Sequence, residues 1–357
     1  MSIQTQSRRQ KIIQLFTTRH KTKILPKNTI LHRKPAPAPI IKEESKILTT
    51  YIPKKKYTIR LLYDTAYWAY YWSSLALQKY APDDFDVDIG NEYTEATKHK
   101  RYDLILQNCF SYAAALKKHT MRVSPSTIVC SVYSVGWGYA NDWLDLCIRD
   151  SDNVIINNVE MWEKHGKRPN TFQISNGIDL GVFGIKKPIE LRKTPRVLWC
   201  GSKIHRGVKN YDSIIVPLEK MLAKDKIQFD FRLVDSVGPN RMNQSQMNYW
   251  YNTGTILVVS SKTEGTPNTL HEGCACGCVP VATRVGNVPE IVTDGVNGFI
   301  CDTNVQSIYG GIKKAIPRYQ EMATAANSTI QGWDWKYKSV EYFDYFRKLI
   351  AEKRCHL

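Results

Sequence analysis

Two glutamates, Glu264 and Glu272, stand in the stretch SSKTEGTPNTLHEGCACGCVPVATRVGNVPE, with seven residues between them. A threonine–proline step follows the first glutamate, and a cysteine-rich run punctuated by glycine follows the second. Paired carboxylates can bind the hydroxyl groups of a ligand, whereas closely spaced cysteines can hold a metal or a redox centre. The chemistry of the stretch therefore depends on the structure that presents it.

The cysteines favour small buried side chains over a metal site. Cys274, Cys276 and Cys278 form a C-x-C-x-C pattern, but zinc sites usually pair two such knuckles or add histidines downstream. Nothing of that kind follows here, so we expect no metal. The nine cysteines of the chain are odd in number and scattered through apolar contexts. That pattern is typical of reduced thiols and not of a disulfide framework.

The residues around the glutamates predict a strand, a tight loop and a helix. The strand covers 255–261, and the helix begins near Pro267 with Thr266 as its cap. The first amides of such a helix, together with its dipole, form an anion site. Glu264 would lie on the loop at the N-terminus of the helix, and Glu272 would lie about one turn into the helix. This arrangement suits a sugar-bearing diphosphate, and the alternative is an exposed helix with incidental acids.

From Tyr57 onward, short apolar runs alternate with segments of helix length, which indicates parallel sheets covered on both faces. The first series of predicted strands covers 57–64, 102–108, 126–134, 152–158 and 171–177. A basic linker at 185–196 precedes a second series at 196–202, 229–235, 255–261, 279–286 and 297–301. We therefore expect an α/β protein with two doubly wound Rossmann-like domains facing across a cleft, where ligands collect at the carboxyl ends of strands.

The expected domain bounds are 57–184 and 185–332, with a C-terminal helix at 333–357 that joins the first domain. Five apolar residues are spaced as one face of this helix, and that face must pack against another element: Val340, Phe343, Tyr345, Phe346 and Ile350.

With these elements placed, the sequence resembles the retaining GT-B glycosyltransferases of the E-x7-E group, the glycosyl transferases group 1. This large group includes glycogen synthases and many mannosyl- and glucosyltransferases. Its signature resembles EG-x-P-N-x-L-x-E-x-x-A-C-G-x-P-V, and this chain reads EGTPNTLHEGCACGCVPV. Further similar pieces are NGIDLGVF at 176–183, VLWCGSKIHRGVKNYDSII at 197–215 and GWDW before the last helix. The resemblance is strong over 176–350 and architectural over 57–175.

The resemblance implies roles for individual residues. Glu264 would contact the transferred sugar and Lys209 would neutralise the donor diphosphate, so these two are the catalytic candidates. Glu272 would bind the ribose of the nucleotide. The candidate donor-binding residues are Gly201, Lys203, Arg206, Gly265, Thr266, Pro267, Asn268, Thr269 and Glu272. Lys203 and Arg206 are included because Ser202 stands where the family has an arginine.

The resemblance also implies retention of configuration, no obligatory metal or other cofactor, and a nucleotide sugar, UDP-linked by preference, as co-substrate. No catalytic histidine is assigned, because Tyr133 stands where the family often has one. His119, His205 and His271 are interpreted as surface or packing residues. Gly286, Pro289 and Glu290 match the segment after the motif and are expected to shape the cleft.

The acceptor is indicated less clearly. Residues 1–56 hold 14 Lys and Arg against two Glu, out of a net charge of +17 for the chain. This basic, proline-bearing N-terminal arm would suit a polyanion. One hypothesis is duplex DNA, with a hydroxymethylated pyrimidine flipped into an aromatic pocket, as in phage-type DNA glycosyltransferases. Aromatic candidates for that pocket are Trp68, Trp72, Tyr133 and Trp137.

The alternative is a peripheral membrane enzyme that glycosylates a lipid-linked or polysaccharide acceptor, with the arm lying on anionic headgroups. A non-catalytic binding module is a third reading, which the intact donor signature disfavours. No apolar run approaches the roughly 18 residues of a membrane span, and the N-terminus lacks an apolar signal region. We therefore expect a cytoplasmic protein, and no stable protein partner is inferred.

Overall fold

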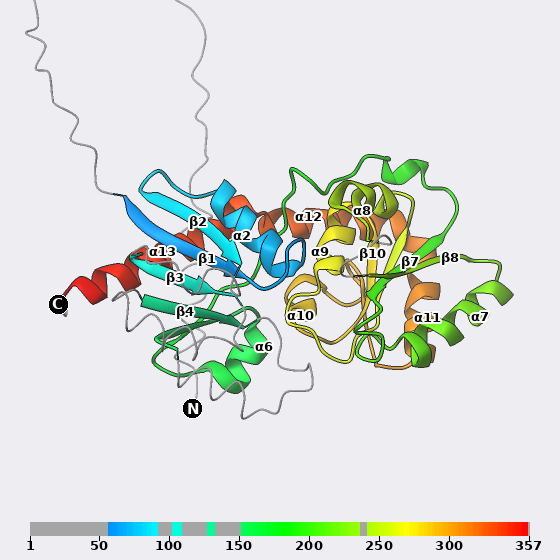
Figure 1. The fold of residues 1–357 in the computed structure, drawn as a ribbon. Coiled ribbons are helices and arrows are strands. Elements are labelled where there is room, and N and C mark those ends of the chain that lie inside the picture. Colours follow the sequence, from blue (N-terminus) through cyan, green and yellow to red (C-terminus); the bar gives the residue numbers. More distant parts are fainter. Residues whose placement is uncertain (1–55, 92–101, 109–126, 133–150, 236–240, 356–357) are drawn as a thin grey trace, which may run out of the picture. The chain divides into compact units, whose positions relative to one another are not determined.

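Two parallel β-sheets organise the chain in the computed structural model, which describes residues 56–91, 102–108, 127–132, 151–235 and 241–355 (Figure 1). Both sheets belong to one compact unit, Pro53–Leu357. The basic N-terminal arm lies outside the described residues. Each strand predicted from the sequence is confirmed, with small differences at the ends.

The first sheet has the strand order β2-β1-β3-β4-β5-β6, and all of its pairings are parallel. Its strands are β1 (Tyr57–Tyr63), β2 (Phe85–Asn91), β3 (Leu104–Gln107), β4 (Thr127–Val132), β5 (Asn153–Ile156) and β6 (Thr171–Gln173). Helix α2 (Ala69–Lys79) follows β1, and the short helix α6 (Val159–Met161) follows β5. The interiors of β1, β3 and β5 are buried and mostly apolar, as expected for a sheet covered on both faces.

Strand β2 was not predicted. Its sequence, FDVDIGN, carries Asp86 and Asp88 between the apolar residues, and β2 pairs only with β1 at the edge of the sheet. Asp88 is an acceptor for the Arg60 guanidinium and for the Tyr102 hydroxyl, at 2.5 Å from the latter. An edge strand exposes one side to water, so acidic residues are tolerated there and hide the apolar signal.

The second sheet has the order β11-β10-β9-β7-β8, again entirely parallel. Its strands are β7 (Arg196–Ser202), β8 (Gln228–Val234), β9 (Ile256–Val259), β10 (Val279–Thr283) and β11 (Phe299–Cys301). The helices around it are α7 (Val216–Lys224), α8 (Gln244–Tyr251), α9 (Asn268–Ala275), α10 (Val288–Ile291), α11 (Val305–Ala315) and α12 (Tyr319–Ile330).

Successive residues of β7 show that both faces of the second sheet are covered. Leu198 packs in a cluster with residues of α8, α9 and α12. Trp199 points to the other face and packs in a cluster with residues of α7 and α11. Alternating side chains therefore enter two separate cores, which is the doubly wound arrangement.

The last helix, α13 (Trp335–Cys355), packs on the first sheet and not on the second (Figure 1). Phe343 is fully buried beside Phe85, with ring centroids 4.7 Å apart. Including Val340 in the packing face was wrong, since its side chain is 55% exposed. The chain reaches α13 through a bridge between Ile178 and Asp334, which joins the NGID and GWDW segments directly.

Candidate active site

The second sheet places two loops at one edge. Strand β7 pairs with both β8 and β9, and β8 lies on the outer side of β7 while β10 lies beyond β9. Along the chain, the strand after β7 is therefore added on one side of it, and the later strands, beginning with β9, are added on the other side. Ligands of open α/β sheets bind outside the carboxyl ends of strands at such a point. The loop after β7 carries Lys209, and the loop after β9 carries Glu264.

The two predicted catalytic residues meet there. The Lys209 ammonium forms an ion pair with Oε1 of Glu264, and the Ser261 hydroxyl donates a hydrogen bond to the same oxygen at 2.6 Å. The side chains are 18% exposed for Lys209 and 7% exposed for Glu264. A cation and an acid thus share a largely desolvated position, where each charge depends on the other.

Hydrogen bonds between the two loops fix this pair. The Ser260 hydroxyl donates to the Lys209 carbonyl at 2.7 Å and accepts from Nε1 of Trp199 at 3.0 Å. The Asn210 side chain donates to the Ser260 carbonyl at 2.8 Å, and Asn210 itself lies in the left-handed region at φ 55°. Asparagine tolerates that conformation better than most residues. The Lys209 backbone is therefore held from both sides.

Helix α9 begins next to Glu264, but its cap differs from the prediction. Asn268 is its first residue and Pro267 is the N-cap, and no side chain caps this terminus. The expectation that Thr266 caps the helix was wrong. Thr266 precedes the N-cap, and its Oγ1 is buried without a hydrogen-bond partner. The first amides of α9, which belong to Asn268 and Thr269, are thus left without a side-chain acceptor.

The Gly265 carbonyl holds the loop between Glu264 and α9 in place through two hydrogen bonds. This carbonyl accepts hydrogen bonds from the Asn287 amide at 3.0 Å and from Nδ2 of Asn158 at 3.3 Å. Gly286 lies against the same carbonyl at φ 52°, and a Cβ there would collide with the carbonyl oxygen. Only glycine fits this position, because both the backbone angle and the space exclude a side chain.

Glu290 ties the segment after the motif to residues near the first sheet. Its Oε1 accepts from the Val159 amide at 2.8 Å, and its Oε2 accepts from the Ser175 hydroxyl at 3.2 Å. Burial raises the pKa of Glu290 above its ordinary value. The residue thus acts as a structural link here.

Glu272 lies on α9. Its Oε2 accepts a hydrogen bond of 2.8 Å from the Tyr251 hydroxyl. Burial raises the pKa of Glu272 to about 7, although the Tyr251 hydrogen bond acts in the opposite direction. Sequence reasoning did not identify Tyr251, because its only signal was an aromatic residue in a helix.

The other donor candidates from the loop after β7 have partners outside the Lys209 pair. Lys203 pairs with Asp235 at 3.1 Å, and Arg206 pairs with Asp212 while its guanidinium lies over the Tyr211 ring. Gly201 lies in β7, where an added Cβ would collide with the Trp199 ring. The acidic partners of Lys203 and Arg206 are therefore Asp235 and Asp212, and not Glu264.

His205 was interpreted as a surface or packing residue, and the structure brings it close to the Lys209 pair. Its ring lies 5.7 Å from the Trp68 ring. Burial, followed by the charge of Lys209, lowers the pKa of His205, while Glu264 opposes the shift. His271, in contrast, is buried in α9 beside the Trp333 ring.

Of the acceptor candidates, Trp68 immediately precedes α2 and Trp72 lies in its first turn. The Trp72 indole donates to the Tyr67 carbonyl at 3.0 Å, and the two rings are 6.0 Å apart. Tyr133 and Trp137 lie outside the described residues, as does His119.

The cysteine run is a packing feature. Cys274, Cys276 and Cys278 are buried and free, as predicted, and burial raises the pKa of the Cys278 thiol to about 12. The described residues contain no group of three or more His, Cys, Asp or Glu side chains placed to hold a metal ion. In the same part of the chain, no helix is long and apolar enough to cross a membrane.

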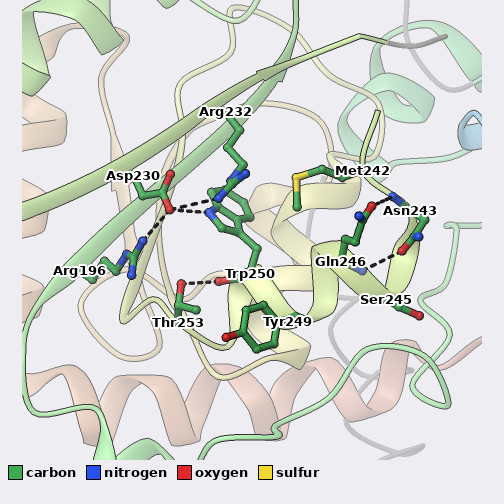
Figure 2. A pocket seen from close by; sticks show the side chains of 10 residues that line it. All are labelled: Arg196, Asp230, Arg232, Met242, Asn243, Ser245, Gln246, Tyr249, Trp250 and Thr253. Carbon is green, nitrogen blue, oxygen red and sulfur yellow. Dashed lines mark hydrogen bonds and ion pairs between the residues drawn. The ribbon is translucent and has the colours of Figure 1, made fainter. Parts of the chain in front are cut away.

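A separate surface groove of about 650 Å³ lies along β8 and α8 (Figure 2). Asp230 lines it and accepts a hydrogen bond from the Arg196 guanidinium at 2.7 Å and from Nε1 of Trp250 at 2.9 Å. Tyr249 also lines the groove and has 75% of its surface exposed. The residues lining the groove include neither Lys209 nor Glu264.

Comparison with known proteins finds a family similarity over part of the chain. Residues 216–317, which include Glu264, Glu272 and α9, match the family model described as glycosyl transferases group 1. Over these residues the chain is thus similar to the glycosyl transferases group 1 family. The D-inositol 3-phosphate glycosyltransferase of Thermobifida fusca is 31% identical over 97 residues, which is 26% of this chain and 22% of that protein.

A second relative is one of the subunits of phosphatidylinositol N-acetylglucosaminyltransferase from Arabidopsis thaliana. It is 31% identical over 101 residues, which is 28% of this chain and 21% of that protein. The chain thus matches about a fifth of the length of these two relatives.

Solved structures agree on the fold of the chain. Sucrose-phosphate synthase from Thermosynechococcus elongatus has a TM-score of 0.66 at 13% identity, covering 83% of this chain and 100% of that one. Anabaena HepE, solved in complex with UDP-glucose, has a TM-score of 0.58 at 16% identity, covering 84% of this chain and 100% of that one. The predicted GT-B fold is confirmed.

Proposed function

We propose that this protein is a glycosyltransferase that moves a hexose from a nucleotide sugar, UDP-linked by preference, onto a hydroxyl acceptor. The observation that carries the proposal is the Lys209–Glu264 pair beside the uncapped start of α9. A desolvated cation next to free helix amides suits a diphosphate, and the neighbouring acid suits sugar hydroxyls. The UDP and UDP-glucose complexes of HepE support the choice of donor.

The donor would lie across the loops that follow β7 and β9. Amides of Asn268 and Thr269 would bind the distal phosphate, because helix dipole and free N–H groups both favour an anion there. Lys209 would turn from Glu264 to the diphosphate. Glu264, held by Ser261, would then accept hydrogen bonds from the sugar, and Glu272 would accept them from the ribose.

The reaction we propose retains the configuration of the sugar. The bond between the anomeric carbon and the diphosphate oxygen breaks, and the bond to the acceptor oxygen forms on the same face. The acceptor proton passes to the departing phosphate oxygen. Negative charge grows on the leaving diphosphate, so Lys209 and the α9 amides act mainly by stabilising it, which is often the largest catalytic contribution.

Two acceptors fit different observations. The relatives named for D-inositol 3-phosphate and phosphatidylinositol favour an inositol-containing or lipid-linked acceptor at a membrane surface. The 14 basic residues among the first 56 favour a polyanion, which keeps hydroxymethylated DNA as the second candidate. The family match covers 216–317, on the side of the donor, and so bears little on this choice. In either case we propose that the enzyme works in the cytoplasm.

The test is mass spectrometry of two acceptors, phosphatidylinositol vesicles and hydroxymethylcytosine DNA, each incubated with a panel of UDP-sugars. The variant Lys209→Met should abolish most transfer. The matched control is Lys313→Met, which removes a surface lysine paired with Asp225 and should leave transfer unchanged. Absence of both sugar transfer and UDP-sugar hydrolysis in the wild-type protein would refute the proposed activity.

A DNA acceptor makes its own prediction about salt. Several phosphate contacts by the arm would make the affinity for duplex DNA fall steeply with salt concentration. Deleting residues 1–50 should then weaken DNA binding and spare the hydrolysis of UDP-sugar. Binding to anionic vesicles without binding to DNA would favour the lipid-linked acceptor.

A further inference from the structure

Tyr251 is a buried residue that the mechanism above does not use. It ends helix α8, has no exposed surface, and packs its ring against Phe183 with centroids 6.4 Å apart. Its hydroxyl donates to Oε2 of Glu272 at 2.8 Å. Burial raises the pKa of Tyr251 well above its ordinary value, so the hydroxyl keeps its proton and can donate to the charged form of Glu272.

Among the described residues, the Tyr251 hydroxyl is the strong hydrogen-bond donor to the Glu272 carboxylate. Two thiols, Cys200 of β7 and Cys276 just after α9, interact electrostatically with Glu272. Burial raises the pKa of both thiols, that of Cys200 to about 12, so they are neutral at physiological pH. No cation forms an ion pair with Glu272 among the described residues. Tyr251 is therefore the polar group that orients this acid.

We infer that Tyr251 is a positioning residue for donor binding: its hydroxyl fixes one oxygen of Glu272, which leaves the other oxygen for the ribose hydroxyls of the nucleotide. The inference rests on the proposed function, because it needs a nucleotide at this site. It adds a residue that acts through Glu272 and does not touch the donor. It also explains how a buried acid without a cation can serve as a hydrogen-bond acceptor.

The consequence is that donor affinity depends on pH through Glu272. Burial raises the pKa of Glu272 to about 7, so the acid is partly protonated at neutral pH and loses acceptor strength as the pH falls. Affinity should therefore fall by up to about tenfold per pH unit below that midpoint and level off above it. Removing the Tyr251 hydroxyl takes away a bond to the charged form, which raises the midpoint by about one pH unit or more.

The experiment is calorimetric titration with UDP-glucose between pH 6 and 9, since both phosphates of this donor keep a constant charge there. The variant Tyr251→Phe removes one oxygen and keeps the ring in its packing. Tyr249→Phe is the matched control, on the same helix with its side chain 75% exposed. Glu272→Gln removes the titrating group. Burial lowers the pKa of His205 below its ordinary value, which moves its titration away from the Glu272 midpoint.

The expected result is an upward shift of the midpoint in Tyr251→Phe, with affinity recovering towards the wild-type value at high pH. Tyr249→Phe should follow the wild type, and Glu272→Gln should bind weakly with no dependence on pH. An equal loss of affinity at every pH, or an unmoved midpoint, would overturn the role of Tyr251 and leave the proposed function standing. If neither UDP-glucose nor UDP binds the wild-type protein at any pH, it is the proposed function that fails.

Discussion

The ion pair between Lys209 and Glu264 can be tested by a double-mutant cycle. The substitutions are Lys209→Met, which keeps much of the side-chain volume without the charge, and Glu264→Gln, which keeps the shape of the acid. Each single variant leaves the other charge without its main partner in a position that is 18% or 7% exposed. The double variant removes both charges, so it isolates the energy of their interaction.

The size of the effect follows from the burial of the pair. Two unit charges 4 Å apart attract by about 4 kcal/mol at an effective dielectric constant of about 20. The cost of removing both ions from water offsets much of this attraction. A coupling free energy of about 1–3 kcal/mol should remain, with Lys209→Met the more harmful single change because Glu264 is the more buried partner. The Ser261 hydrogen bond to Glu264 reduces that loss without replacing the charge.

The assay is urea unfolding of the four proteins, followed by UDP-glucose hydrolysis. If Lys209 stabilises the departing diphosphate, Lys209→Met should lower turnover about 10²–10³-fold, as the loss of one charge-stabilising donor does elsewhere. Glu264→Gln should also lower turnover. A coupling energy near zero would show that the pair is not formed in the protein. Full turnover in both single variants would show that the site is misassigned even if the pair forms.

Three further changes test the surrounding structure. Gly286→Ala should weaken UDP-glucose binding and lower the melting temperature, because a Cβ there meets the Gly265 carbonyl oxygen. The control Gly295→Ala has open space around the added Cβ and should cost only about 1–2 kcal/mol of backbone strain. Arg192→Ala should cost about 3–5 kcal/mol in urea unfolding, since the buried guanidinium donates to four backbone carbonyls; a loss under 1 kcal/mol would contradict this. Phe343→Ala should cost about 3–5 kcal/mol, against less than 0.5 kcal/mol for Val340→Ala, and equal losses would place α13 wrongly.

The sequence was informative wherever one residue type could satisfy the local chemistry. The apolar runs of the second sheet predicted its strands because both faces of that sheet are buried, as β7 shows by placing Leu198 and Trp199 in different cores. Glu264 was predicted on a loop and Glu272 on a helix, and both are found there. The family resemblance assigned Lys209 and Glu264, 55 residues apart, to one donor site, but it did not predict the ion pair between them.

What the sequence did not reveal depends on tertiary neighbours. The acidic residues of β2 are tolerated because the strand is at an edge and Arg60 reaches Asp88, which no local pattern encodes. Thr266 has the chemistry of a helix cap, but the proline after it becomes the N-cap instead. Tyr251 and Tyr249 share one short helix, and only the fold decides that the first reaches Glu272 and the second faces solvent.

The topology offers a reason for where the acceptor should bind. Both sheets reverse their strand order once, the second between β7 and β9 and the first between β1 and β3. If the donor lies at the second reversal, the loop after β1 is the equivalent place for the acceptor, because ligands gather at such points. Trp68 follows β1 in that loop, and its ring lies 5.7 Å from His205 of the donor loop. The acceptor hydroxyl should therefore reach the sugar past Trp68, so Trp68→Ala should raise the Michaelis constant for the acceptor far more than that for UDP-glucose.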